Sequence, residues 1–532
     1  MMKSENNHDA TADCTSGKYF ENPILPGFYP DPSICRVGED YYLVTSSFSY
    51  FPGIPIFHSR DLINWKQIGH VLDRPSQLDL DDGGHSAGIY APTIRYHQGK
   101  FFVITTNVTR GGNFIVTADN PSGPWSDPYW LNDAPGIDPS LFFDDDGKAY
   151  YVGTSEAPEG GKYFGDNEIW LQELDLNTMT LTGQRYGLWR GALKNAIWPE
   201  GPHIYKINGM YYLLIAEGGT DYLHSVTIAR SRQLTGPYEG NPGNPILTHR
   251  HLGRAYPIAN TGHADLIETQ NGEWWMVALA SRPYGGYFRN LGRETFMAPV
   301  EWEDGWPVVS PGTGKLEFKY LRPELPQDPE IVPQVRDDFD SAEFELVWNV
   351  LRTPREQFWS LTDRPGYLRL RLRPEKLTEL SNPSFICRRQ QHMNFSAAAC
   401  MEFRPVEDNE AAGIALIQSN DFNLRMEYTW AAGQNEVRLI RCFNGEETIL
   451  ARQELAGPKV YMKVTAEGQD YSFYLGNTEN DMKPLAEKVD GRLLSTDVAG
   501  GFVGTYIGMY ASSDGKGSSN HADFDWFEYK QC

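Results

Sequence analysis

The sequence predicts an all-β protein in which a five-bladed β-propeller is followed by a C-terminal β-sandwich. Three features of the 532 residues support this fold class. A unit of about 50–60 residues, built from short strand-like runs and turns, recurs five times in roughly the first 300 residues. A proline-rich stretch then interrupts the repeats. Beyond it, runs of alternating apolar and polar residues predict antiparallel strands, and runs with a helical period are hard to find.

Each repeat opens with a short motif, and an aromatic pair follows ten to twelve residues later at the start of an apolar run. Equivalent strands of propeller blades converge on one axis, so residues at the same repeat position should meet there. The residues at the first motif position are Asp31, Ala91, Asp138, Gly201 and His263, with Glu200 directly before Gly201. We therefore expect three carboxylates and a histidine at one central mouth.

The domain boundaries follow from the breaks in these patterns. The stretch from Arg322 to Pro333 holds four prolines and lacks alternation, which is typical of a linker. The predicted organisation is a disordered tail over residues 1–20, the propeller over 21–321, the linker over 322–334 and the sandwich over 335–532.

Within the predicted sandwich, alternation with period two marks half-buried strands. Examples are Tyr367–Leu372 and Phe422–Tyr428, and Phe524–Tyr529 is predicted as a terminal strand.

Composition narrows the classes of function. The formal net charge of −23 argues against nucleic acid as a partner, because phosphate contacts need clustered Lys and Arg. The chain has no run of 18 apolar residues, so no membrane span is predicted. Residues 1–19 lack the apolar core of a secretory signal, which predicts a cytoplasmic protein unless a leader has been removed. Six cysteines without C-x-x-C spacing indicate free thiols.

The expected carboxylates suit the hydrolysis of a glycosidic bond, in which one acid protonates the leaving oxygen while another activates water. We assign Asp31 as the base, since a carboxylate on the first strand can face water and remain ionised. We assign Glu200 as the acid, because Trp198 and Pro199 beside it offer an apolar wall that raises its pKa. Asp138 would orient substrate and raise the pKa of the acid by like-charge repulsion.

These motifs also have plainer explanations. Asp before Pro is common turn chemistry. Glu200 stands one residue out of register with the other two acids, and such a shift turns a side chain to the opposite strand face unless a β-bulge intervenes. Turns elsewhere in the repeat do not preserve an acid, and this favours the catalytic interpretation.

Four motifs in combination resemble the signatures of glycoside hydrolase family 43, and most of all its two-domain β-xylosidases and α-L-arabinofuranosidases. The motifs are Phe28–Ser33, Gly136–Leu141, Trp198–Pro202 and Leu291–Thr295. The likeness covers nearly the whole chain, including Gly500–Phe502 and Tyr506–Met509 in the sandwich. It implies a five-bladed propeller, hydrolysis with inversion, Asp31 as base, Glu200 as acid and Asp138 as the residue that tunes the acid.

The resemblance also implies functions for the surrounding side chains. Arg293 would hold Asp138 and a sugar hydroxyl, Phe48 would wall the sugar site, and Phe502 would reach from the sandwich over the propeller mouth. Tyr90 stands where such relatives carry a tryptophan, which leaves a thinner wall that can donate a hydrogen bond and puts the pentose preference in doubt. A surface salt bridge for Arg293 and ordinary packing for Phe48 and Phe502 are the plainer alternatives.

No cofactor is required for this chemistry. The resemblance implies a structural calcium ion on the propeller axis beside His263, with water completing its shell of oxygen ligands. A buried histidine with satisfied hydrogen bonds is the alternative.

The sequence thus predicts an inverting exo-glycoside hydrolase that releases terminal β-D-xylose or α-L-arabinofuranose from xylan- or arabinoxylan-derived oligosaccharides. Its expected partner is the oligosaccharide, not nucleic acid or a membrane, and assembly as a homo-oligomer stays open. Two alternatives remain: an arabinanase or galactosidase on the same fold, and a non-catalytic carbohydrate-binding protein whose sandwich performs the recognition.

Overall fold

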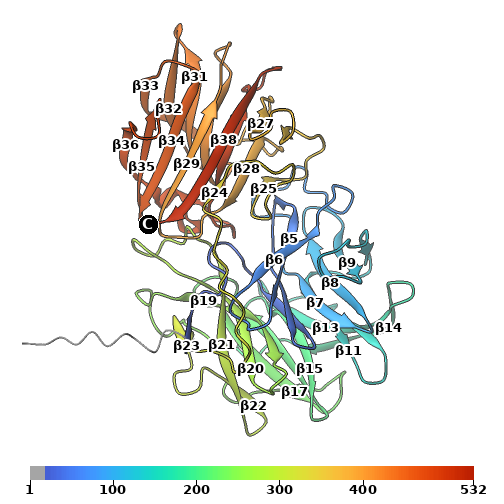
Figure 1. Ribbon diagram of the computed structural model, residues 1–532. Coiled ribbons are helices and arrows are strands. Elements are labelled where there is room, and N and C mark those ends of the chain that lie inside the picture. The colour runs from blue at the N-terminus through green and yellow to red at the C-terminus, as the bar shows by residue number, and fades with distance from the viewer. Residues whose placement is uncertain (1–17) are drawn as a thin grey trace, which may run out of the picture.

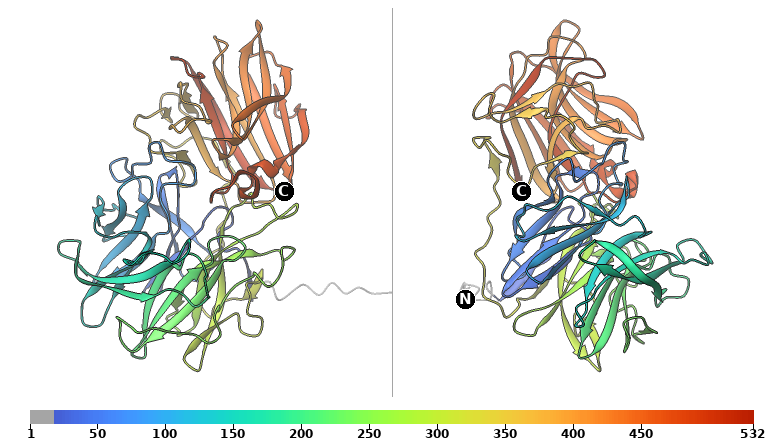
Figure 2. Two further views of the ribbon diagram at one scale, coloured as in Figure 1. Left: turned by 180° about the vertical axis from the view of Figure 1, so that it is seen from behind. Right: turned by 90° about the vertical axis from the view of Figure 1, so that its right-hand side faces the viewer.

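The protein, seen in a computed structural model that describes residues 18–532, consists almost entirely of β-strands in two domains (Figure 1). The propeller runs from blue to yellow along the chain, and the orange and red sandwich stacks on one side of it, as both views of Figure 2 show. The two helices among the described residues are short: η1 (Gly491–Leu494) and α1 (Thr496–Ala499).

Five four-stranded antiparallel sheets form the blades, and each uses strands that are close in sequence, which confirms the repeat argument. The first strands of the five blades contact one another around the axis. They are β2 (Ser33–Val37), β7 (Thr93–His97), β11 (Ile137–Phe143), β15 (Glu200–Ile207) and β19 (Ala259–Glu268). The other blade strands are β3 (Asp40–Val44), β5 (Gly53–Ser59), β6 (Lys66–Leu72), β8 (Lys100–Asn107), β9 (Gly112–Ala118), β10 (Tyr129–Trp130), β12 (Ala149–Glu156), β13 (Asn167–Asp175), β14 (Thr180–Trp189), β16 (Met210–Glu217), β17 (Ser225–Ser231), β18 (Glu239–Gly240), β20 (Trp274–Ser281), β21 (Glu294–Glu303) and β22 (Trp306–Val309).

The two ends of the propeller chain are tied together. Strand β1 (Tyr19–Glu21) pairs with β23 (Lys319–Leu321). The predicted tail over residues 1–20 therefore extends too far: residues 1–17 lie outside the described part of the chain, whereas Tyr19 and Phe20 belong to a strand. The physical reason is that Phe20 is buried between the rings of Trp275 and Tyr320.

The sandwich consists of two eight-stranded sheets. One contains β24 (Arg336–Asp337), β26 (Trp359–Ser360), β27 (Leu368–Arg371), β29 (Asn394–Glu402), β34 (Lys459–Glu467), β35 (Asp470–Gly476), β36 (Lys483–Asp490) and β38 (His521–Gln531). The other contains β4 (Tyr50–Phe51), β25 (Asn349–Leu351), β28 (Ser384–Arg389), β30 (Ala411–Ser419), β31 (Phe422–Ala431), β32 (Gln434–Phe443), β33 (Glu446–Glu454) and β37 (Tyr506–Ser512). The three alternating runs singled out in the sequence lie in β27, β31 and β38.

One strand of the sandwich comes from the propeller. Strand β4 pairs with β25, with Val350 opposite Phe51 and Leu351 opposite Tyr50. The ring of Tyr50 stacks on that of Tyr506 with a centroid distance of 3.5 Å, and its hydroxyl contacts His85 Nε2 at 2.8 Å. The two domains therefore share one sheet and are joined by buried aromatic contacts, of which that between Tyr50 and Tyr506 is one.

The five described cysteines are free, as expected, and Cys14 lies outside the described residues. Among residues 18–532 no helix combines the length and apolar character needed to cross a membrane.

The burial of Phe20 generates a stability prediction. Phe20→Ala removes a ring that is 3% exposed, so we expect the free energy of unfolding to fall by about 3–5 kcal/mol in urea denaturation. The matched control is the neighbouring Tyr19→Ala, whose side chain is 38% exposed and whose effect should stay within about 0.5 kcal/mol. Equal effects of the two variants would contradict the role of Phe20 in tying the ends together.

Candidate active site

In four of the five blades, the motif at the start of the inner strand has the same unusual backbone conformation. Asp31, Asp138, Gly201 and His263 all have positive φ, at 55°, 51°, 56° and 42°. This region is costly for residues other than glycine and persists only where the surrounding structure enforces it. The pairing register also shifts between Glu200 and His203, and between Ile137 and Ser140. Glu200 stands one residue out of register with Asp31 and Asp138. The register shift that follows it is the β-bulge that allows its side chain to point to the same strand face as theirs.

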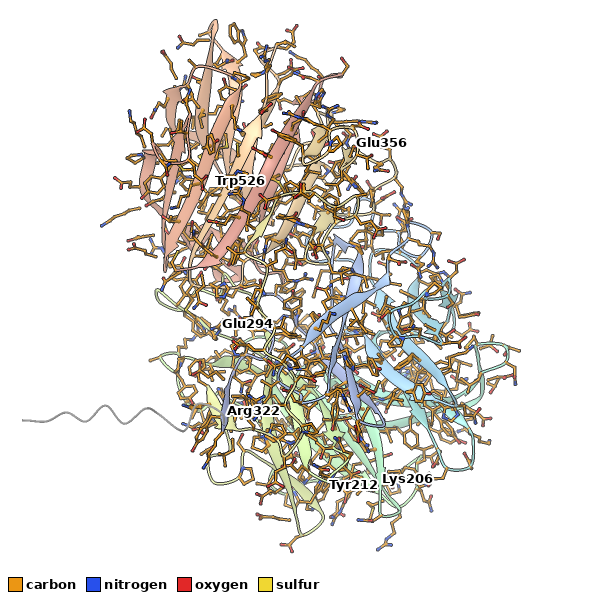
Figure 3. All side chains as sticks on the ribbon, viewed as in Figure 1. Lys206, Tyr212, Glu294, Arg322, Glu356 and Trp526 are labelled. Carbon is orange, nitrogen blue, oxygen red and sulfur yellow. The ribbon has the colours of Figure 1, made fainter. Side chains whose placement is uncertain are left out.

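All eight side chains predicted for the site line one pocket of about 180 Å³. They are Asp31, Phe48, Tyr90, Asp138, Glu200, His263, Arg293 and Phe502. Ala91, Ile137, Trp198 and Thr220 complete the lining. The pocket lies where the propeller meets the sandwich, because Phe502 belongs to the sandwich. Glu294, next to Arg293 in the chain, is labelled near this junction in Figure 3.

Three of the four additional lining residues belong to the repeat motifs or stand close to them in the sequence. Trp198 flanks the predicted acid, Ile137 precedes Asp138, and Ala91 occupies the repeat position in the second blade. Thr220 belongs to no repeated motif. Only the fold shows its place, which is beside Arg293.

Asp31 is buried and held from two sides. Arg293 Nη1 donates to Oδ1 at 2.7 Å, and Ser46 Oγ donates to Oδ2 at 2.5 Å. His263 Nδ1 lies 4.0 Å from Oδ1. Burial by itself favours the neutral form, but the positive charge of Arg293, the nearby His263 ring and the hydrogen bond from Ser46 outweigh it and lower the pKa of Asp31. The carboxyl group is therefore ionised at neutral pH.

Arg293 differs from its predicted role. Its side chain donates hydrogen bonds to Asp31 and to Thr220 Oγ1, the latter at 3.1 Å, and none to Asp138. The expected contact with Asp138 is therefore wrong, and the reason is geometric: Asp31 occupies the position in front of the guanidinium. Arg293 acts on Asp138 only through its charge.

The pKa values of Glu200 and Asp138 shift in the opposite direction from that of Asp31. Burial in the pocket wall, followed by the negative charges of Asp138 and Asp31, raises the pKa of Glu200 well above its ordinary value. Burial also raises the pKa of Asp138, to about 6, although the nearby His263 ring and a hydrogen bond from the Gly201 backbone oppose the rise. At neutral pH Asp138 is therefore mostly ionised, whereas Glu200 tends to retain its proton beside it and Asp31.

Aromatic rings cover the other side of the pocket. The ring centroid of Phe48 lies 5.1 Å from that of Tyr90 and 6.3 Å from that of Phe502. The Tyr90 hydroxyl donates to the backbone oxygen of Ser86 at 3.1 Å, and the Ser86 hydroxyl accepts from the backbone N–H of Phe502 at 2.9 Å. Ser86 therefore connects the propeller wall to the sandwich loop.

The surroundings of His263 do not form a calcium shell from protein atoms. Calcium prefers six to eight oxygen ligands, whereas His263 offers nitrogen. No group of three or more metal-binding side chains occurs within residues 18–532. The His263 ring instead packs against Gly201, where an added Cβ would come within 2.9 Å of it. The side chains present therefore do not fit a calcium site by themselves.

The arrangement supplies an ionised carboxylate and a protonated carboxylic acid around one small cavity. Such unequal proton affinities allow one group to accept a proton while the other donates one. The aromatic rings provide an apolar face for a ring-shaped ligand, and the volume is below the roughly 300–1,000 Å³ of sites for drug-sized molecules.

Comparisons with known proteins agree with this geometry. The model for the glycosyl hydrolases of family 43 matches residues 20–307, and the model for a β-xylosidase C-terminal concanavalin A-like domain matches residues 336–530. A xylosidase/arabinosidase of Butyrivibrio fibrisolvens is 50% identical over 96% of this chain and 99% of its own length. A non-reducing end α-L-arabinofuranosidase of Bacteroides ovatus is 41% identical over 96% of this chain and 95% of its own length. The solved structure of a xylan β-1,4-xylosidase from Bacillus halodurans is 38% identical, covers 96% of this chain and 100% of its own, and superposes with a TM-score of 0.90.

The coupling between Asp138 and Glu200 can be measured directly. Asp138→Asn removes a negative charge beside Glu200, so ionisation of Glu200 becomes less costly and its pKa should fall. A carboxyl-carbon NMR titration of labelled protein reports this shift. Asp119→Asn, an exposed change in a different loop, serves as the control and should leave the Glu200 titration unchanged. An unchanged pKa of Glu200 in Asp138→Asn would contradict the coupling.

Proposed function

Because the chain belongs to glycosyl hydrolase family 43, we propose that it hydrolyses the glycosidic bond of a terminal β-D-xylose or α-L-arabinofuranose unit in short oligosaccharides. The observation that carries the proposal is that one pocket holds two carboxyl groups in opposite surroundings. Asp31 accepts hydrogen bonds from Arg293 and Ser46, which lower its pKa, whereas burial and the neighbouring carboxylates raise the pKa of Glu200.

In the proposed reaction, Glu200 donates its proton to the leaving oxygen while Asp31 accepts a proton from the attacking water. Burial and the neighbouring Asp138 keep Glu200 protonated until this step. As the bond breaks, positive charge develops on the sugar ring, and the ionised Asp31 stabilises it. Once Glu200 has given up its proton, the repulsion from Asp138 favours reprotonation before the next cycle.

The shape of the pocket supports attack at a chain end. Phe502 from the sandwich closes over a cavity whose other walls are Phe48 and Tyr90 of the propeller. A cavity of about 180 Å³ matches one sugar ring better than an extended chain. The names of the relatives, a xylosidase/arabinosidase and a non-reducing end α-L-arabinofuranosidase, support the same two terminal pentoses.

A panel of nitrophenyl glycosides tests the proposal. We expect the wild type to hydrolyse the β-D-xyloside or the α-L-arabinofuranoside, and the corresponding galactoside much less. Asp31→Asn removes the base and should lower kcat by about 10²–10⁴-fold. Glu200→Gln removes the acid and should lower kcat by a similar factor on xylobiose, but by less on nitrophenyl substrates, because nitrophenolate leaves without protonation.

The exposed substitutions Asp119→Asn and Glu301→Gln are the matched controls and should retain wild-type rates. A wild type that binds xylan fragments but hydrolyses no glycoside would favour the carbohydrate-binding alternative. Full activity of Glu200→Gln on xylobiose would show that another group is the acid.

The stereochemical course is a separate prediction. If Asp31 activates water on the face opposite the leaving group, the first sugar released from a β-xyloside is α-xylose. Proton NMR of the anomeric signal in the first minutes of reaction, before mutarotation, distinguishes the two anomers. Initial release of β-xylose would instead require a covalent intermediate and exclude Asp31 as a general base.

A further inference from the structure

In residues 27–30, which lead into Asp31, every backbone carbonyl group accepts a hydrogen bond. Tyr29 N–H donates to Gly27 O at 2.8 Å, Thr295 Oγ1 to Tyr29 O at 2.7 Å, and Ser46 N–H to Pro30 O at 3.1 Å. These three donors belong to the propeller. The carbonyl of Phe28 is different, because its donor is Arg389 Nε of the sandwich, at 2.7 Å.

Arg389 is an unusual side chain to find at this place. It is 3% exposed, and the charged or polar groups that act on it most strongly are tyrosines and a cysteine, with no carboxylate of residues 18–532 in an ion pair with it. Its charge is met instead by Phe28 O, by Asn349 Oδ1 at 3.0 Å, and by the faces of the Tyr29 and Tyr506 rings at 4.3 and 5.3 Å. Burying a cation without a carboxylate is costly, and an apolar side chain would fill the same space at lower cost. Packing alone does not account for an arginine here.

The contacts of Phe28 lead directly to the pocket. Its ring lies 5.5 Å from that of Phe48, and the Arg293 guanidinium lies 5.4 Å from the Phe48 ring centroid. Arg293 in turn binds Asp31, which is three residues beyond Phe28 and has a positive φ. Phe28 therefore influences the position of the Asp31 carboxylate in two ways: through the backbone that connects them, and through the contacts of its ring with Phe48 and thence Arg293.

We propose that Arg389 is a positioning residue through which the sandwich fixes the Asp31 carboxylate against Arg293 and Ser46. The inference rests on the proposed function, in which Asp31 is the base. Arg389 touches neither substrate nor the reacting atoms. It holds the Phe28 carbonyl, and the strained turn at Asp31 is thereby fixed from both domains. The sandwich thus contributes to the chemistry as well as to the pocket wall.

The test is Arg389→Met, which keeps much of the volume and removes the donor and the charge. Displacing a catalytic group by about 1 Å can cost on the order of a hundredfold in rate, so we expect kcat per folded molecule to fall by about 10–100-fold while KM changes less than about threefold. Weaker contact between Asp31 and Arg293 also raises the pKa of Asp31 towards its ordinary value. Because the base must be ionised, the acid limb of the kcat/KM profile moves to higher pH.

Arg352→Met is the matched control. Arg352 is also a buried sandwich arginine, is 1% exposed, and binds backbone and amide oxygens: Gly83 O, Ser381 O and Asn420 Oδ1. None of these hydrogen bonds goes to residues 27–31. Its loss should lower the free energy of unfolding, as that of Arg389 does, but should leave the acid limb in place and kcat within about threefold.

Arg389→Lys keeps a cation and one donor and should recover part of the lost rate. If Arg389→Met does not fold, the comparison of Arg389→Lys with Arg352→Lys decides in the same way. A wild-type kcat and acid limb in the Arg389 variants, or equal losses in the Arg352 variants, would overturn the positioning role. A wild type inactive on the whole substrate panel would overturn the proposed function itself, and the two failures are therefore distinguishable.

Discussion

The contact between Arg293 and Asp31 joins the first and last blades of the propeller and sets the charge in its pocket. Arg293 lies just before β21 in the last blade, and Asp31 lies just before β2 in the first, so the ion pair bridges the seam at which the ring of blades closes. The same pair stabilises one negative charge in a pocket that contains three carboxyl groups. Since like charges this close repel one another, the charge on Asp31 helps Glu200 to remain neutral. One interaction thus connects the topology with the chemistry.

Much of this arrangement could be predicted from the sequence because the propeller is a repeat. Residues at the same place in each unit must meet at the axis, and this alone predicts that Asp31, Asp138 and His263 lie together. The proline-rich linker and the alternating strands separated the sandwich for an equally simple physical reason. The aromatic residues Phe48, Tyr90 and Phe502 needed the family resemblance, since an aromatic side chain in a β-protein usually packs in a core.

Other features depend on contacts between segments that no local pattern connects. The partner of Arg293 was predicted wrongly because sequence motifs do not state which of two nearby acids a guanidinium faces. Thr220 and Arg389 lie outside every repeated motif, and their importance comes from the groups they touch. The start of β1 at Tyr19 could not be read from a short polar stretch, since its pairing partner lies 302 residues away at Leu321.

The shared strand β4 has a consequence for how such proteins can diversify. A sandwich without this propeller would lack the strand that pairs with β25. The unpaired backbone groups of β25 would then be exposed, and exposed strand edges promote aggregation. A propeller deprived of its sandwich would in turn leave the face of Tyr50 without the ring of Tyr506. Exchange of both domains together would preserve these contacts, whereas exchange of either domain alone would disrupt them.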